Sequence, residues 1–544
     1  MRGQVALRAS LARTPTSAVT SDLPSLHAPS TVRSGARNDL VLACVAIAVM
    51  AVQLLWGLQA SDSASYNIIW TQAFRQAWAR GELYPRWLTD SFEGLGSPTF
   101  YFYPPLAFFL TGLIHALGVE VTRAITLATT LLLFASGVAM ERWLRWRGTP
   151  SLLAAALYMA LPYRVTDIYD RGALAEHAAF VWLPLIAIGI EALPRRWAPA
   201  LLAASVAGLL LTHLVTALLA LVFLIAPLGI RRVLQSRETL VPGLCGAIVG
   251  AGLAGFFLLP ALTLQDQIQT DLLWTPHYQV TNWFIWNWDR SRWLAFGPLL
   301  LSCAGVVILA YQERRWWFWL TALAALSAFG LLPILGLPIL SMVQFPWRTI
   351  GIVLFLGMTA FAGRRLSLRT TLLALCFLSL GWANEYGEAA QKILKWGAQP
   401  AAALDGMPDA AEYLPRGLKA GVTDLQRQPR LEAYSAYPRS SAVSFRRSGE
   451  HTIGRAAFPI WRLVHNGREI PYSGPLISFK GGPGEYRVER RWIWQEEVGA
   501  IVSALALMAL VFMVFRGIGP GNLSWARVCR TRGTRTTDGA FNYP

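Results

Sequence analysis

Long apolar blocks without a charged side chain are the feature that most constrains how this chain folds. Residues 41–58, 124–140 and 501–515 contain no acidic or basic residue. Blocks of this length match the ~30 Å hydrocarbon core of a bilayer. Inside lipid every backbone N–H and C=O must be satisfied within the segment, so these blocks are expected to be helices. The sequence therefore predicts an all-α polytopic membrane bundle.

Composition supports this class and excludes others. The chain is 54% hydrophobic and only 15% charged, whereas soluble domains are about 25% charged. The net charge is +17, but most arginines flank apolar blocks, where they orient a membrane protein. We therefore expect the lipid bilayer, and no nucleic acid, as a partner. The five Cys have no metal-ligand spacing.

Arginine clusters set the expected topology, with both termini on the cytoplasmic side of the membrane. If the short apolar segment 104–118 does not cross, every later short-loop arginine cluster falls on the cytoplasmic side. We expect that segment to be a juxtamembrane or re-entrant helix. About twelve spans then follow, at residues 39–58, 122–141, 150–163, 177–194, 198–212, 214–230, 240–262, 294–311, 316–333, 346–362, 370–386 and 497–515.

The expected domain order follows from these spans. Residues 1–38 form a disordered cytoplasmic arm, and 39–386 form the transmembrane module with a first outer loop at 59–121. Residues 387–495 contain short β-like runs and the hairpin signal Asn466-Gly467, which suits a type I′ turn. We expect a small β-rich extracytoplasmic domain there. A last transmembrane helix (496–516) and a basic cytoplasmic tail (517–544) complete the chain.

Charged residues at the expected outer face are the candidate site. Asp62 lies where the first span ends, before an amphipathic helix that reaches about Arg80 and has the expected apolar face Ile69, Phe74, Ala77 and Trp78. It is either a helix N-cap or a carboxylate that acts as general base or metal ligand. Asp167, Asp170 and Glu176 form a second acidic group. They are either a solvated turn or partners of Asp62 in binding an acceptor hydroxyl or a divalent cation.

Three outer arginines break the positive-inside pattern and need a compensating anion. Arg164, Arg171 and Arg348 pair either with neighbouring acids or with a lipid phosphate, which guanidinium binds in a bidentate fork. His213, at an outer turn, is either a satisfied polar contact or part of the site.

Several motifs resemble one family of proteins. The runs "GLGSPTFYFYPPL", "LPYRVTDIYDRGALAEHAAFVWLPL" and "VQFPWRTIGI" are similar to a bacterial multispanning family labelled 6-pyruvoyl-tetrahydropterin synthase-related. No residue here supports pterin chemistry. A first span that ends in Asp, followed by a long outer loop, also resembles GT-C-type glycosyltransferases. The stretch "FPIWRLVHNGREI" is similar to the outer β domain of YfhO-like proteins.

The resemblance implies an inverting transfer of a sugar from a polyprenyl-phosphate-linked donor to an envelope glycan or lipid acceptor. It carries the catalytic Asp over to Asp62. Members of the family have a His four residues later, where this chain has Tyr66. We expect Asp62, Asp167 and Asp170 to be catalytic, with Mg or Mn as a possible cofactor at Asp62 and Asp167. The expected substrate- and phosphate-binding residues are Arg164, Arg171, Glu176, His213, Arg348, Tyr66, Tyr101 and Tyr103.

Two other classes of function stay open at this stage. A transporter or flippase for lipid-linked sugars would predict paired broken helices. A non-catalytic membrane scaffold would bind envelope polymers through the β domain. Close approach of Asp62 to Asp167 or Asp170 would favour one shared substrate, whereas wide separation would favour the scaffold.

Overall fold

The computed structural model describes residues 30–311, 316–363, 367–398, 409–416, 418 and 442–517. Most of the predicted arm and tail, and the segments 399–408 and 419–441, lie outside these ranges. The chain divides into two compact units, residues 1–41 and 42–544, and every candidate residue belongs to the second. Helix α1 begins at Ser30, within the predicted arm.

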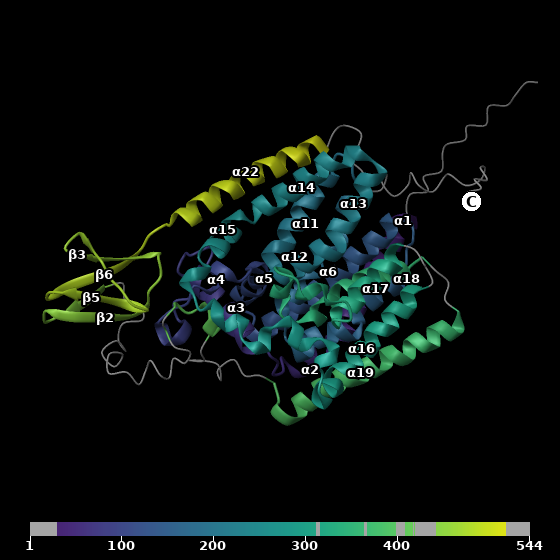
Figure 1. Cartoon of the computed structure of the whole chain (residues 1–544), viewed down its shortest axis with the longest axis horizontal. Coiled ribbons are helices and arrows are strands. Elements are labelled where there is room, and N and C mark those ends of the chain that lie inside the picture. Colours follow the sequence, from purple (N-terminus) through teal and green to yellow (C-terminus); the bar gives the residue numbers. More distant parts are fainter. Residues whose placement is uncertain are drawn as a thin grey trace, which may run out of the picture. The chain divides into compact units, whose positions relative to one another are not determined.

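Helices dominate the described residues, as predicted (Figure 1). Those before the middle of the chain are α1(Ser30–Val49), α2(Ala51–Trp56), α3(Ala64–Ala79), α4(Thr99–Phe102), α5(Leu106–Ala116), α6(Val121–Trp146), α7(Leu152–Ala160), α8(Pro162–Val165), α9(Leu174–Ala179), α10(Trp182–Glu191), α11(Ala198–Thr212), α12(Leu214–Ala220) and α13(Ala226–Gln235). The later ones are α14(Leu240–Leu253), α15(Gly255–Thr263), α16(Arg290–Ala310), α17(Trp316–Ala328), α18(Ile350–Phe361), α19(Leu368–Trp396) and α22(Trp494–Gly517).

The predicted count of about twelve spans is not confirmed. Among the described residues, five helical stretches are long and apolar enough to cross a membrane: Val121–Trp146, Leu174–Glu191, Leu214–Gln235, Arg290–Ala310 and Trp494–Gly517. The pair α14 and α15, bent by 70° at its break, would be a sixth. Shorter apolar helices lie at Leu106–Ala116, Ala198–Thr212, Trp316–Ala328 and Pro346–Phe361.

Helix breaks explain the difference. The span expected at 150–163 contains only the nine-residue helix α7, which at 1.5 Å per residue is about 14 Å long. Helix α7 ends at Ala160, with Leu161 as its C-cap, because Pro162 lacks the N–H that would continue the ladder. The span expected at 39–58 is interrupted at Met50, between α1 and α2. The segment expected not to cross, 104–118, contains only the eleven residues of α5.

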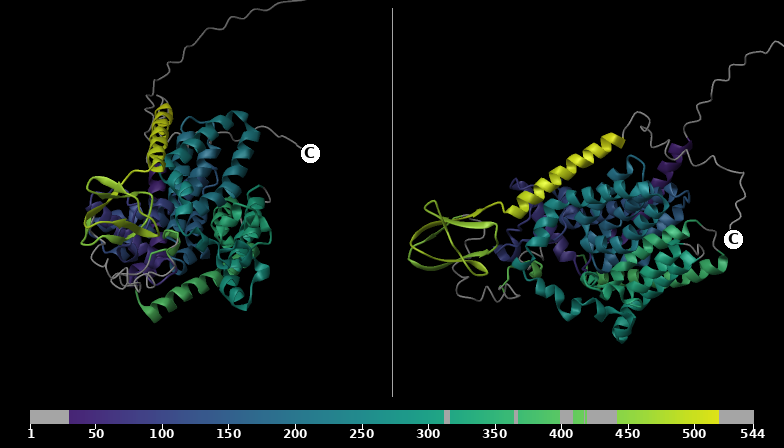
Figure 2. Two further views of the ribbon diagram at one scale, coloured as in Figure 1. Left: turned by 60° about the vertical axis from the view of Figure 1, so that its left-hand side comes forward. Right: turned by 45° about the horizontal axis from the view of Figure 1, so that its top comes forward.

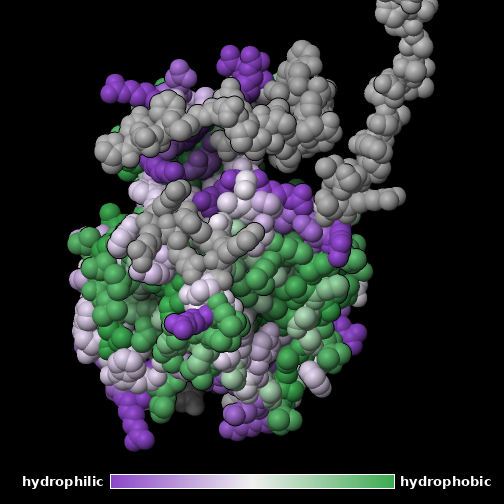
Figure 3. All heavy atoms as spheres, turned by 90° about the vertical axis from the view of Figure 1, so that its right-hand side faces the viewer, coloured by the Kyte–Doolittle hydropathy of each residue, from purple (hydrophilic) through white to green (hydrophobic). Residues whose placement is uncertain are grey.

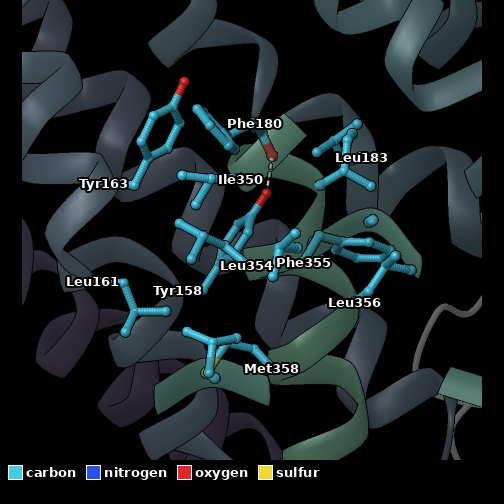
Figure 4. Close-up of a cluster of buried hydrophobic side chains, with 14 of the residues drawn as sticks. Tyr158, Leu161, Tyr163, Phe180, Leu183, Ile350, Leu354, Phe355, Leu356 and Met358 are labelled. Atoms are coloured by element: carbon cyan, nitrogen blue, oxygen red, sulfur yellow. Dashed lines mark hydrogen bonds between the residues drawn. The ribbon is translucent and has the colours of Figure 1, made fainter. Parts of the chain in front are cut away.

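Helix α18 lies at the centre of the main hydrophobic core. Each of its residues, from Ile350 to Phe361, is buried, as expected of a helix that is apolar on all sides. Its side chains pack against residues from the segment around α7 and α10 (Figure 4). There the Tyr158 hydroxyl donates a 2.8 Å hydrogen bond to the carbonyl oxygen of Phe180. The polar atom is thus satisfied inside an apolar core.

The last helix leaves most of its apolar surface uncovered. Helix α22 packs along α14 and α15, and it stays beside them in both views of Figure 2. Only a small part of it is buried, and Met508, Phe512 and Phe515 are exposed. Other exposed hydrophobic residues gather in broad patches on the face in Figure 3, bordered by hydrophilic residues at its upper and lower ends. Lipid would cover surfaces of this size.

The predicted β-rich domain is present between α19 and α22. A four-stranded antiparallel sheet has the order β1-β6-β3-β4, and β2 pairs with β5. The strands are β1(Ala442–Phe445), β2(Gly449–Ala456), β3(Trp461–His465), β4(Arg468–Ile470), β5(Leu476–Gly481) and β6(Gly484–Arg490). Asn466 and Gly467 both have positive φ between β3 and β4, so the predicted hairpin turn is confirmed.

The loop between α2 and α5 packs against these strands. The rings of Trp87 and Trp461 lie 5.1 Å apart, edge to face. At the start of α22, the buried Glu496 accepts hydrogen bonds of 2.7 Å from the Tyr101 hydroxyl and from Arg490. This cluster links the loop, β6 and α22. Its hydrogen bonds compensate the buried charge of Glu496, which would destabilise the protein if it were unpaired.

Candidate functional site

The segment Pro162–Ala179, between α7 and α10, forms the centre of the candidate site and is called the winding below. Helix α8 is followed by a π-helical turn, Thr166–Asp170, and then by α9. Tyr163, Asp167 and Arg171 are spaced four residues apart, so they lie on one face of this winding. Gly172 has a positive φ of 59°, which lets the chain turn back towards α9 and bring Glu176 to the same face.

Arg171 holds this face together. Its Nη1 donates to Asp167 Oδ1 at 2.5 Å and to the Tyr163 hydroxyl at 3.1 Å. Its Nη2 donates to Glu176 Oε2 at 2.9 Å, and the Tyr163 hydroxyl donates to Glu176 Oε1 at 2.5 Å. Two buried carboxylates thus share one guanidinium. Burial, together with the negative charge of Glu176, raises the pKa of Asp167.

Arg348 reaches the same group from a distant part of the chain. It lies in the 3₁₀ turn Pro346–Thr349, directly before α18. Its Nε is 3.6 Å from Glu176 Oε2, which is too long for a hydrogen bond, and Nε is buried without a partner in the described structure. Nη1 donates to the carbonyl of Val343 at 3.2 Å. Arg348 therefore retains donor capacity towards an anion.

Arg164 is separate from this group, although the sequence placed it beside Arg171. The side chain is fully buried, and its guanidinium lies 4.1 Å from the centre of the Phe180 ring. It donates to the carbonyl of His177 at 3.2 Å and to Ser136 Oγ at 3.4 Å. An enclosed guanidinium of this kind anchors the winding to the bundle and offers no open face to a lipid phosphate.

Asp62 lies against the winding from the other side. Its backbone N–H donates to the Asp170 carbonyl at 3.2 Å, and that of Ser63 donates to the Arg171 carbonyl at 3.0 Å. The Asp62 side chain is exposed. Partial burial of the carboxylate, and then the charge of Asp170, raise its pKa. The N-cap position of α3 is Ser63 rather than Asp62, and no side-chain hydrogen bond caps the helix. Asp62 is thus available for another role.

Lys392, which the sequence analysis missed, lies near Asp170 and Asp62. It extends from α19 and forms an ion pair with Asp170. It also acts on Asp62, whose pKa its positive charge lowers. Helix α19 continues to Trp396, past the predicted span end at 386, and so carries Lys392 to the site. The only sequence signal was a Lys in an otherwise Arg-rich chain.

The remaining predicted residues divide between the site and the surrounding structure. His213 caps α12 by accepting from the Thr216 N–H at 3.3 Å, and it lies close enough to Glu176 and Arg348 for their charges to act on its ring. Tyr103 is likewise near Arg348 and Glu176. Tyr101 instead binds Glu496.

The carboxylates of this site already have cationic partners within the protein. Within the described ranges, no group of three or more His, Cys, Asp or Glu side chains is arranged to hold one. Asp167 is engaged by Arg171 and Asp170 by Lys392, so cations from the protein already neutralise these carboxylates. The Mg or Mn hypothesis for Asp62 and Asp167 stays a prediction, and no chemical step below depends on it.

No protein-family model matches the chain, and no curated protein matches it. Among solved structures, it is similar to the cryo-EM structure of the arabinofuranosyltransferase AftD from mycobacteria, with 19% sequence identity and a TM-score of 0.43. The similarity covers 64% of this chain and 27% of the AftD chain, so the chain spans about a quarter of its length.

Proposed function

We propose that the protein is a membrane glycosyltransferase that moves a sugar from a polyprenyl-phosphate-linked donor to an envelope acceptor at the outer face. The observation that carries the proposal is the contact between Asp62 and the winding that holds Asp170 and Arg171. An exposed carboxylate therefore lies within electrostatic reach of the Arg171 guanidinium, and Arg348 contacts the same group of charges through Glu176. An acid to accept a proton and cations to hold a phosphate are the groups that this reaction requires.

The donor phosphate binds Arg348 and Arg171 in this proposal. Arg348 Nε has no hydrogen-bond acceptor in the described structure and faces Glu176 at 3.6 Å. When Asp167 is protonated, the pair of arginines carries one positive charge more than the acids beside it. A phosphate oxygen would satisfy the Arg348 donor and compensate that charge. Tyr103 and His213 border this position, and the sugar extends towards Asp62.

Asp62 acts as the general base. Its carboxylate takes the proton of an acceptor hydroxyl while the hydroxyl oxygen forms a bond to the anomeric carbon of the donor sugar. The bond from that carbon to the phosphate oxygen breaks, and polyprenyl phosphate leaves with the bonding electrons. Arg348 and Arg171 stabilise the charge that develops on the leaving phosphate. Direct displacement of this kind inverts the anomeric configuration. The raised pKa of Asp62 makes it a stronger base than an ordinary aspartate.

The decisive test is Asp62→Asn, which removes the base but keeps the shape of the side chain. We expect sugar transfer in membranes to fall by about 10²–10⁴-fold, the usual contribution of a general base. Lipid-linked sugars should accumulate as they do in a deletion strain. Asp90→Asn is the matched control, because Asp90 is another exposed acid of the same loop, and among the described residues its ion pair is with Arg80 alone. Unchanged transfer by Asp62→Asn membranes would end the assignment.

A flippase for lipid-linked sugars is the second candidate, because of one specific feature. Helices α14 and α15 form a helix pair bent by 70°, which is the kind of broken span that transporters use. The described residues contain one such pair, whereas the transporter class predicts two in corresponding positions. A flippase would move the intact donor from one leaflet of a vesicle membrane to the other without cleaving it. Release of polyprenyl phosphate by purified protein separates the two functions.

A further inference from the structure

The short segment 409–416, between α19 and the β strands, is held firmly over the outer loop. The buried Asp409 accepts four hydrogen bonds, from Trp70 Nε1 (2.7 Å), Ser91 Oγ (2.9 Å), Thr99 Oγ1 (2.9 Å) and the Ala410 N–H (2.7 Å). Both oxygens of this carboxylate are thus hydrogen-bonded to donors within the protein. Asp409 fixes the segment rather than binding a ligand.

Two backbone hydrogen bonds hold the other end of the segment. The N–H of Gln269 donates to the Leu414 carbonyl at 3.0 Å, and the N–H of Arg416 donates to the Gln267 carbonyl at 3.2 Å. The residues between the two ends, Ala411–Tyr413, form a single 3₁₀ turn. Glu412 therefore occupies a defined position and is not on a loose loop.

Glu412 differs from the other enclosed acids of this region. Asp167 and Glu176 pair with Arg171, Glu496 pairs with Arg490, and Asp409 is saturated by donors. Glu412 is partly buried, and its carboxylate accepts a hydrogen bond from its own backbone N–H, but no cation and no side-chain donor among the described residues pairs with it. Burial raises its pKa, and nearby Asp409 raises it further. The carboxylate can therefore accept further hydrogen bonds from a ligand.

Tyrosines from three other places surround this carboxylate. The charge of Glu412 acts on Tyr66 of α3, on Tyr103 after α4, on Tyr278 of the turn Pro276–Tyr278 and on its neighbour Tyr413. None of the four hydroxyls has a hydrogen bond to a described residue, in contrast to Tyr84, Tyr101, Tyr158 and Tyr163. Tyr66, Tyr103 and Tyr413 also pack in one hydrophobic cluster with Trp70, so their hydroxyls lie near a carboxylate that has no cationic partner among the described residues.

Aromatic faces complete this group. The ring of Trp70 lies 4.6 Å from that of Tyr103 and 5.7 Å from that of Tyr66. Tyr413 stacks on Phe102 with an angle of 4° between the planes. Tyr103 is shared with the phosphate side, because the charges of Arg348 and Glu176 act on it as well. The group thus lies next to the proposed donor position.

We propose that Glu412, with Tyr66, Tyr103 and Tyr278, forms a carbohydrate subsite that binds the acceptor sugar through its hydroxyl groups. The carboxylate accepts hydrogen bonds from sugar hydroxyls, the tyrosine hydroxyls exchange hydrogen bonds with them, and the rings contact the apolar C–H face of the sugar. This combination fits a carbohydrate better than a lipid chain, which offers no donor, and better than a phosphate, which the carboxylate would repel. Glu412 is an acceptor-binding residue, and Tyr66 of the same subsite lies in the first turns of α3, four residues after the base Asp62.

The subsite rests on the proposed function, but its test measures binding without transfer. The full chain is purified in a zwitterionic detergent, since alkyl glycosides would themselves occupy the subsite. Methyl hexopyranosides and methyl pentofuranosides are titrated, and their binding is followed by saturation-transfer NMR. We expect Glu412→Gln to weaken the binding of the best glycoside by about 10- to 100-fold, because a hydrogen bond to a charged group is lost.

Matched variants keep the result decisive. Asp271→Asn is the control, since Asp271 is an exposed acid on the neighbouring turn Thr270–Trp274 and should leave binding unchanged. Tyr278→Phe removes one hydroxyl from a different segment and should weaken binding several-fold. It replaces Glu412→Gln in the test if that variant does not fold. No binding of any glycoside, or equal binding by both variants and the wild type, would overturn the subsite. Asp62→Asn protein should still bind the glycoside, so failure of the transferase proposal gives a different pattern.

Discussion

The backbone N–H of Asp62 donates to the carbonyl oxygen of Asp170 across 3.2 Å, although more than 100 positions separate the two residues in the sequence. Three further bonds continue this contact. Ser63 donates to Arg171, Asn67 to Gly172 at 2.7 Å, and the Gln59 side chain to Tyr169 at 3.0 Å. The end of the first apolar segment is therefore bonded directly to the charged winding. A small shift of either one would move the proposed base relative to the phosphate-binding arginines.

Removal of the Lys392 charge should change the pH profile of transfer. Lys392 lowers the pKa of Asp62 and neutralises Asp170, whose charge raises it. In Lys392→Met both effects act in the same direction, so the pKa of Asp62 rises. Because the base must be deprotonated, the acid limb of kcat/KM should move to higher pH, while the rate well above that limb stays near wild type. Measured profiles of Lys392→Met and of the exposed Lys395→Met provide the comparison. Identical acid limbs would separate Lys392 from the base.

Arg348→Gln should weaken binding of the donor phosphate while the fold is preserved. The side chain makes one hydrogen bond, to Val343, and its pairing with Glu176 is long. Loss of a charge-assisted hydrogen bond to phosphate corresponds to about 1.5–3 kcal/mol, or roughly 10- to 100-fold in Kd. Native mass spectrometry of polyprenyl phosphate bound in nanodiscs measures this change. Arg80→Gln, at an exposed arginine of the outer loop, is the control. Equal affinities of the two variants would remove Arg348 from the donor site.

Arg171→Met should destabilise the protein more than any other single substitution in the site. Asp167 and Glu176 would both lose the guanidinium that they share, and one would remain charged and buried. Breaking a buried ion pair from one side costs about 3–5 kcal/mol. Addition of Asp167→Asn should recover part of this loss, because it removes one of the two orphaned carboxylates. Thermal unfolding of the detergent-solubilised variants gives the comparison. A double variant as unstable as the single one would show that Asp167 carries no charge penalty.

Labelling should test the expected membrane orientation. With the native cysteines replaced, Pro150→Cys lies just after the arginine cluster that ends α6, and Asp90→Cys lies in the outer loop; both positions are exposed. We expect a membrane-impermeant maleimide to modify Asp90→Cys in intact cells and Pro150→Cys only after permeabilisation. Modification of Pro150→Cys in intact cells would place the two positions on one side. The proposed donor site would then face the wrong compartment.

Local sequence patterns predicted much of the fold. The amphipathic helix after Asp62 is present as α3, and Phe74 and Ala77 of its predicted apolar face are buried. Ile68 is buried in place of the predicted Ile69, because the helix faces the winding as well as the bundle. The hairpin at Asn466 was predictable because a type I′ turn needs positive φ at two adjacent residues. Span number was not, because short and broken helices share their composition with long ones.

For the candidate site, the sequence by itself determined which groups exist: acids and arginines at the ends of apolar segments, where a membrane protein needs a reason to keep them. Only the tertiary structure decided which of them meet. It joined Asp62 to the winding, turned Arg164 inward and Arg171 towards the acids, and brought Arg348, Lys392 and Glu412 from later segments. The physical reason is that charge and hydropathy are local properties of a segment, whereas the side on which a side chain emerges depends on helix breaks and long-range packing.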